Sequence, residues 1–318
     1  MLPDPAKAAD RLGRSQPLIL IKGPNPYERM RSDDRQDPPV GYKTILVHCN
    51  DGQRLSRLLD PAVRLSAAFG AHLIGLSVSP PITVIPAGMP GTPDTIVFDE
   101  LTNAYRAKNP AMKAAFQEAA AAQNITTEWR EEDAGTDTVT RVVSRHARAA
   151  DLVIASQAVS DAKGSRSVDI PDGLALQSGR PVLIIPNGRS AQPVPNRVVV
   201  GWTARREATR AMFDALPLLK RADKVTLLEV DPEPVQETME YRTAACATLA
   251  RHGVTCEAEA VITSHGNAGD ALLAYCEQTK ADLLVMGCYG HSRLREFVLG
   301  GASRRLLAGM TLAVLMSH

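Results

Sequence analysis

The stretch VMGCYGHSRLREFVLGGASRRLL, residues 285–307, decides how this chain is interpreted. It begins inside an unbroken apolar run, ADLLVMG (281–287), which is typical of a strand buried on both faces of a sheet. It ends inside GASRRLLAGM (301–310), which has the pattern of a short helix. Because a glycine-framed loop joins the two, the stretch favours a ligand loop at the carboxyl end of a parallel strand.

The chain repeats itself after residue 40. Four apolar runs occur twice in the same order: KTILVHC (43–49) and RVVVGW (197–202), AHLIGLSV (71–78) and KVTLLEV (224–230), ADLVIAS (150–156) and ADLLVMG (281–287), RPVLIIP (180–186) and LAVLMS (312–317). The first copy is longer, and we assign its extra residues to a Pro- and Gly-rich surface insertion at 80–100. The sequence therefore predicts two domains, 41–188 and 196–318, with the linker NGRSAQPVPN (187–196) between them.

Residues 1–40 are predicted to be an N-terminal extension, partly disordered and without chemistry, because they are rich in Pro, Arg and Asp. Two interpretations of this extension stay open, a packing arm and a misassigned start.

Helical patterns lie between the apolar runs. Residues 206–222 form an amphipathic pattern that Pro217 is expected to kink or break; its apolar face holds Ala208, Met212, Ala215, Leu216 and Leu219. Thr136 and Asn267 are expected to cap the helices at 136–150 and 267–281. We therefore predict an α/β, Rossmann-like fold of two tandem doubly wound domains, each a five-stranded parallel sheet flanked by helices.

Composition narrows the function. The 318 residues carry a formal net charge of +1 and 4% aromatic residues, which gives no basis for nucleic-acid binding. The apolar run in QPLILIK, near residue 20, is too short for a signal peptide or a membrane span. The five cysteines are dispersed without metal-site spacing, which predicts reduced thiols, a cytoplasmic location and no metal site.

The loop has the parts of a phosphate cradle. Glycines at 287, 290, 300 and 301 allow backbone N–H groups to approach an anion, and the following helix directs its positive end toward the same place. Ser303 adds a hydroxyl, and positive charge is available from Arg293, Arg295, Arg304 and Arg305. Two interpretations remain open on spacing alone, a phosphate site and a set of ordinary turns beside a solvated basic face.

MGCYGHSRLREFVLGGASRRLL, together with MTLAVLMSH, resembles the C-terminal signature of the universal stress protein family. Nucleotide-binding members of that family carry G-x2-G-x9-G followed by Ser or Thr, and here Gly287, Gly290 and Gly300 are followed by Gly301. The resemblance covers about residues 42–318, in two tandem copies, and implies ATP, possibly with Mg²⁺, bound between this loop and the first strand of the second copy. The implied binding residues are Trp202, Thr203, Val230, Met286, Gly287, Gly290, His291, Gly300, Gly301, Ala302 and Ser303.

Two departures from the family pattern bear on this site. An Asp usually follows the first strand, but Thr203 stands there in the second copy and Asn50 in the first. The first copy's loop, at 155–177, has Ser156 and Val159 in place of the first two glycines and Val168 or Asp169 near the third, so we predict that it does not bind ATP. The resemblance further implies that the last strands of the two copies pair at their edges as an internal pseudo-dimer. Homodimers of the tandem remain possible.

Three functions are compared. The first is a stress-response binding or signalling module that takes an adenine nucleotide in its second copy. The second is an interaction protein whose glycines only form turns. The third, an enzyme, is the weakest, because His291 has no identified partner and Ser292 lacks the second glycine of a nucleophile elbow. At most a weak ATPase activity is expected.

Overall fold

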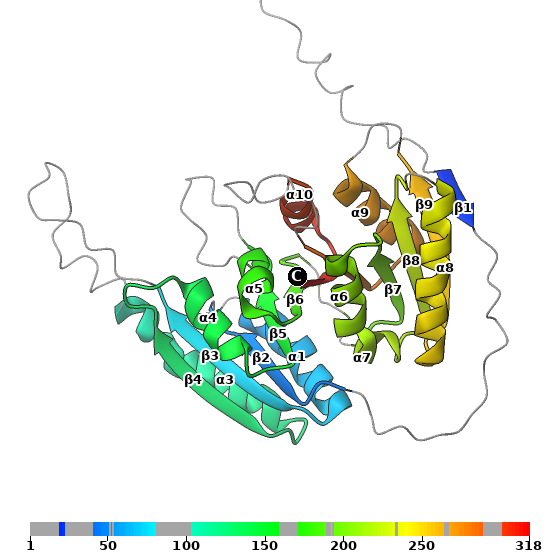
Figure 1. Cartoon of the computed structure of the whole chain (residues 1–318). Helices are drawn as coiled ribbons and strands as arrows, with labels where there is room; N and C mark the ends of the chain where they lie inside the picture. The colour runs from blue at the N-terminus through cyan, green and yellow to red at the C-terminus, as the bar shows by residue number, and fades with distance from the viewer. Residues whose placement is uncertain are drawn as a thin grey trace, which may run out of the picture.

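The computed structural model describes residues 19–22, 41–50, 52, 54–80, 103–158, 171–188, 192, 194–232, 235–263, 267–288 and 301–318. Within them, strands and helices alternate along the chain (Figure 1). The strands are β1 (Ile19–Lys22), β2 (Thr44–His48), β3 (His72–Ser79), β4 (Thr127–Asp133), β5 (Leu152–Ser156), β6 (Val182–Ile185), β7 (Arg197–Gly201), β8 (Lys224–Val230), β9 (Cys256–Ile262), β10 (Leu283–Gly287) and β11 (Ala313–Ser317). The helices are α1 (Leu55–Phe69), α3 (Asn109–Ala121), α4 (Val139–Ala147), α5 (Pro171–Ser178), α6 (Arg206–Asp214), α7 (Leu216–Leu219), α8 (Val235–Arg251), α9 (Ala268–Thr279) and α10 (Gly301–Gly309).

The strands form one eleven-stranded sheet in the order β1-β9-β8-β7-β10-β11-β6-β5-β2-β3-β4. Strands β2 to β6, the first half, are parallel to one another, and so are β7 to β11, the second half. Each half places its first strand in the middle and its third and fifth strands at its edges, which is a doubly wound order. The predicted fold class is confirmed.

Each face of the sheet carries its own hydrophobic cluster. One cluster holds side chains from α1, α3, α6, α7 and α8, and the other holds side chains from α4, α5, α9 and α10. Alternate residues of the same strand serve the two clusters: Val198 and Val200 of β7 join the first, and Val199 joins the second. Central strands buried on both faces need no polar alternation, which is why the apolar runs marked them in the sequence.

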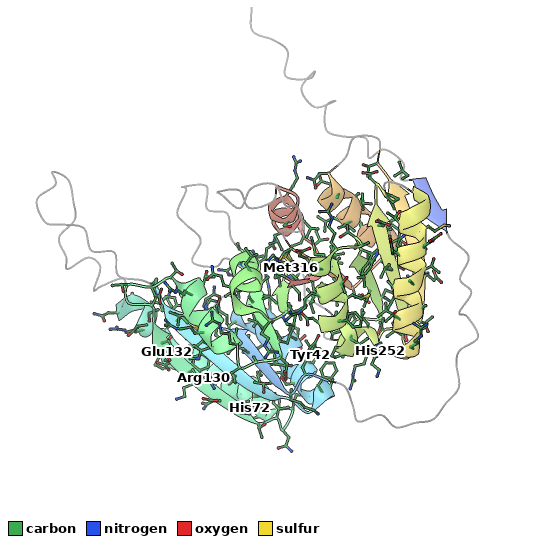
Figure 2. All side chains as sticks on the ribbon, in the orientation of Figure 1. Tyr42, His72, Arg130, Glu132, His252 and Met316 are labelled. Carbon is green, nitrogen blue, oxygen red and sulfur yellow. A yellow bond between two sulfur atoms is a disulfide. The ribbon has the colours of Figure 1, made fainter. Side chains whose placement is uncertain are left out.

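The two halves meet where β6 pairs with β11 in antiparallel fashion, with Leu183 opposite Leu315. This is the edge pairing that the family resemblance implied. Side-chain contacts support it: the Tyr42 hydroxyl donates to the Asp214 carbonyl oxygen at 2.8 Å. The Arg221 guanidinium lies 4.6 Å from the centre of the Phe69 ring. Figure 2 shows Tyr42 and Met316 near the junction of the halves.

Helix boundaries follow local chemistry, with one correction. Pro217 separates α6 from α7 as predicted. Asn267 caps α9, and its side-chain oxygen accepts from the Gly269 N–H at 2.8 Å. The predicted Thr136 cap is wrong, because Thr138 caps α4 and accepts from the Arg141 N–H at 3.2 Å. Either threonine fits a capping pattern, and only the path of the chain selects between them.

Three strands lie outside the repeated apolar runs. The sequence of β4, TEWREED, is mostly charged, and β9 carries Glu257 and Glu259. The third is β1, which lies within the predicted N-terminal extension and pairs antiparallel with β9. Across the described residues, no helix combines the length and apolar composition needed to cross a lipid bilayer.

The prediction of five reduced thiols is wrong for two of them. Cys246 of α8 and Cys256 of β9 form a disulfide, with their Cα atoms 5.4 Å apart. The turn after α8 folds β9 back beneath the helix, which a spacing of ten residues does not reveal. The other thiols, Cys49, Cys276 and Cys288, are buried. Burial raises the pKa of Cys49 and of Cys276 to about 12, so both stay protonated at neutral pH.

We expect denatured protein that has not been reduced to expose three reactive thiols per chain, rising to five after reduction. The double variant Cys246→Ala/Cys256→Ala should lower the free energy of unfolding by about 2–4 kcal/mol, because the cross-link restricts the unfolded chain. Thiol titration and denaturant unfolding measure the two quantities. Five reactive thiols before reduction would contradict the disulfide.

We expect the double variant Leu20→Pro/Ile21→Pro to increase hydrogen exchange at the β9 backbone. One of any two successive residues in an antiparallel strand lies in a hydrogen-bonded pair, so one of the two prolines must remove an N–H that β9 uses. The matched control is Leu20→Val/Ile21→Val, which keeps both N–H groups. Equal protection of residues 259–262 in all three proteins would show that β1 does not cover this edge.

Candidate functional site

The predicted site lies at the carboxyl edge of the second half. In the registers of β7 with β8 and β10, Gly201 stands opposite Leu228 and Met286. Thr203 and Val230 each follow these paired positions by two residues, so they reach the same edge. The helices that leave these strands also begin at this edge, as in other open parallel sheets. The structure thus brings together the ends of β7, β8 and β10.

Trp202 is a core residue. Its side chain is 7% exposed and belongs to the cluster beneath α6, while its backbone N–H donates to the Leu228 carbonyl oxygen at 2.7 Å. In the part of the chain that the structure describes, its indole N–H has no hydrogen-bond partner. Such a group costs free energy when buried, so the site holds a donor that an acceptor on a ligand would satisfy.

The other strand-end residues differ in exposure. Thr203 is exposed, whereas Val230 and Met286 are half-buried against the cluster beneath α9 and α10. The Thr203 carbonyl oxygen accepts from the Arg205 N–H at 2.6 Å. The edge thus presents one exposed polar residue and two half-buried apolar residues.

Gly287 makes room for a helix. A Cβ atom at this position would lie 2.5 Å from the carbonyl carbon of Glu207 and 2.6 Å from the Ala208 nitrogen. Both atoms belong to the first turn of α6, which therefore packs directly on the end of β10. The first glycine of the predicted loop is thus required by helix packing, whatever the ligand.

A carboxylate already occupies the start of α6. Burial raises the pKa of Glu207, but the hydrogen bond from Arg206, at 2.7 Å, and one from the residue's own N–H outweigh burial. The pKa of Glu207 therefore lies below its usual range, and the side chain is an anion at neutral pH. Sequence analysis missed this residue, since an acid beside arginines is unremarkable by itself. The carboxylate is paired with the Arg206 guanidinium, so an ion pair occupies this helix end.

Another helix that starts at this edge is α10. Gly301 and Ala302 form its first turn, and Ser303 is 8% exposed. Arg305 is exposed, with its guanidinium 3.9 Å from the Asp270 carboxylate. Gly290, His291 and Gly300 lie outside the described residues, as do Arg293 and Arg295. The described part of this edge therefore comprises the ends of β7, β8 and β10 and the start of α10.

Replacing Gly287 with alanine should destabilise the protein by about 1–3 kcal/mol, because the added methyl overlaps the backbone of α6. Gly309→Ala is the matched control, since its Cβ would lie 3.5 Å from Leu273, an ordinary contact. Thermal and denaturant unfolding compare the two variants with the parent protein. Equal stability of Gly287→Ala and the parent protein would contradict the tight packing.

Comparison with known proteins gives a family match to the second half. The sequence model of the universal stress protein family matches residues 195–318. Universal stress protein Slr1230 of Synechocystis sp. (strain PCC 6803) is 36% identical over 67 residues, which cover 21% of this chain and 22% of that relative. The chain thus matches about a fifth of the length of this curated relative.

Solved structures extend the likeness of fold to both halves. A universal stress protein from Archaeoglobus fulgidus DSM 4304 superposes with a TM-score of 0.66 at 17% identity, over 86% of this chain and 95% of the other. A protein of Pseudomonas aeruginosa UCBPP-PA14, provisionally named a universal stress protein, gives 0.51 at 16% identity, over 87% and 93%. The sequence model of the universal stress protein family thus covers the second half of this chain, and the chain as a whole has the fold of the Archaeoglobus protein.

Proposed function

We propose that the second half binds an adenine nucleotide, ATP with or without Mg²⁺, at the carboxyl edge of β7, β8 and β10. The observation that carries the proposal is that the family match and the glycine loop fall in the same half of the chain. The family match covers the half whose glycine loop leads into the start of α10. The first half has neither the family match nor the loop glycines.

The proposed contacts divide between the two ends of the nucleotide. Trp202, Thr203, Val230 and Met286 would serve the base and sugar, because their strand ends adjoin. The phosphates would be held by the group Gly290, His291, Gly300, Gly301, Ala302 and Ser303, through backbone N–H groups and the helix dipole. Gly287 stays in the site as the residue that allows α6 and β10 to approach.

The proposed role is that of a stress-response binding or signalling module. Nucleotide would favour one conformation or one partner state, which requires only differential affinity and no chemical step. The units are the extension 1–40 and the domains 41–188 and 196–318. The junction of β6 and β11 would act as an internal pseudo-dimer interface. Two copies of the whole chain could also form a homodimer. Catalysis, beyond a weak ATPase activity at most, is not part of the proposal.

A cytoplasmic location completes the proposal. One observation favours it and one opposes it. The three buried thiols fit a reducing compartment, whereas the Cys246–Cys256 disulfide fits an oxidising one. The thiol titration described above therefore bears on location as well as on stability.

The second candidate is an interaction protein that binds no nucleotide. Two observations favour it: the steric role of Gly287 explains one loop glycine without a ligand, and Glu207 places a negative charge at the same edge. Thr203, in the position of the family's usual Asp, also removes a sugar contact. A direct binding measurement separates the two candidates.

Small molecules released by denaturing freshly purified protein, analysed by mass spectrometry, should include ATP or ADP at about one per chain if only the second half binds. The double variant Gly290→Val/Gly300→Val should lose binding while keeping its fold, because valine prevents close approach of backbone to phosphate. Gly188→Val is the matched control, since Gly188 stands in open space.

Two nucleotides per chain would show that the first half also binds. Absence of nucleotide, together with no thermal shift in millimolar ATP and Mg²⁺, would favour the interaction protein. Binding that survives both valines would overturn the proposed phosphate loop.

A further inference from the structure

Gln157 of the first half holds the end of a helix that belongs to the second half. Its side chain is 8% exposed at the end of β5. The side-chain N–H groups donate to the carbonyl oxygens of Leu307 at 2.6 Å and Ala308 at 3.3 Å, both in the last turn of α10. Those carbonyls are among the four that a helix leaves without partners at its carboxyl end. The first half therefore caps α10.

The remaining groups of Gln157 are fixed within the first half. Its side-chain oxygen accepts from the Asn187 N–H at 2.9 Å. Its backbone oxygen accepts from the Asn187 side chain at 3.2 Å and from Arg54 at 3.3 Å. A buried amide with both ends bonded has one orientation, so it is a rigid link between Asn187 and α10.

The repeat shows what this residue replaces. In each half, the residue after the fourth strand donates its N–H to the carbonyl oxygen that ends the fifth strand. Gln157 donates to Ile185 at 2.8 Å, and Cys288 donates to Ser317 at 2.9 Å. Gln157 and Cys288 are thus equivalent positions. In the second half, the chain continues from this position into the glycine loop. In the first half, the residue at this position forms hydrogen bonds to the end of α10.

The two ends of α10 therefore serve different halves of the chain. Its first residue, Gly301, belongs to the proposed phosphate site, and its last turn is bonded to the first half. A helix of nine residues moves as one body, because its internal hydrogen bonds resist bending. A shift of the Gln157 contact is therefore also a shift of the N–H groups that would face the phosphates.

We propose that Gln157 is a positioning residue that couples the first half to nucleotide binding in the second half through α10. The inference rests on the proposed function, and it gives the first half a regulatory part in it. By linkage, a nucleotide that fixes α10 strengthens the contact with Gln157 by the same free energy that the contact adds to nucleotide binding.

The affinity test uses the full chain and ATP with Mg²⁺, by isothermal titration calorimetry. Gln157→Met keeps the length of the side chain and removes its hydrogen bonds, and Gln157→Glu keeps the acceptor for Asn187 but has no N–H for α10. The control is Gln177→Met, an exposed glutamine on the neighbouring helix α5. Both Gln157 variants should bind ATP at least about fivefold more weakly than the parent and the control.

The second readout is hydrogen exchange, and its first measurement uses the parent protein alone. In the parent protein, ATP should slow exchange at the Asn187 N–H, far along the chain from the nucleotide site. In folded Gln157→Met that effect should disappear. A purely structural role for Gln157 would change stability without producing this response.

Three results are decisive. Weaker binding in the Gln157 variants, with ATP-dependent protection of Asn187, supports the coupling. Equal affinity in parent, control and Gln157 variants, or no protection at Asn187 on binding, overturns the coupling and leaves the proposed function intact. A parent protein that binds no ATP overturns the proposed function, and the coupling with it.

Discussion

The structure depends above all on the antiparallel pairing of β6 with β11. This contact turns two five-stranded parallel sheets into one sheet, and both hydrophobic clusters run across it. Because the pairing is antiparallel, the carboxyl edges of the two halves face opposite ways. Each half therefore has a carboxyl edge of its own, and α10 links the two, because it starts at the edge of the second half and its last turn is bonded to Gln157 at the edge of the first. The glycine loop at one edge and Gln157 at the other are two uses of the same position.

The candidate site shows how packing and binding compete for the same residues. Gly287 is a loop glycine in the family pattern, yet the first turn of α6 occupies the space where its side chain would be. Glu207 then supplies the negative charge that favours the start of α6. Of the helix starts considered at this edge, that of α10 is the one left for a phosphate. The site is therefore defined by the Glu207 carboxylate at the start of α6 as well as by the start of α10.

The outer edges of the sheet are protected in two different ways. β4 is dominated by charged side chains, among them the Glu128–Arg130 pair, and charge discourages pairing with another strand. β9 is more apolar, and β1 covers it with four paired residues. A segment that looked like an extension without a role thus completes the sheet of the second half. The repeated apolar runs marked the four buried strands of each copy. They missed β4 and β9 because strands near the edge of a sheet need no unbroken apolar run, and the short run at β1 was assigned to the extension.

The sequence by itself determined the tandem repeat, the parallel α/β architecture, the break at Pro217 and the cap at Asn267. These follow from apolar periodicity, proline geometry and capping chemistry, all of which act over short stretches of chain. Only the tertiary structure decided that Cys246 meets Cys256, that Gly287 lies against Glu207, and that Gln157 reaches Leu307. The last of these contacts joins residues 150 positions apart. Such contacts are set by how helices and strands pack, and no local pattern of residues encodes that.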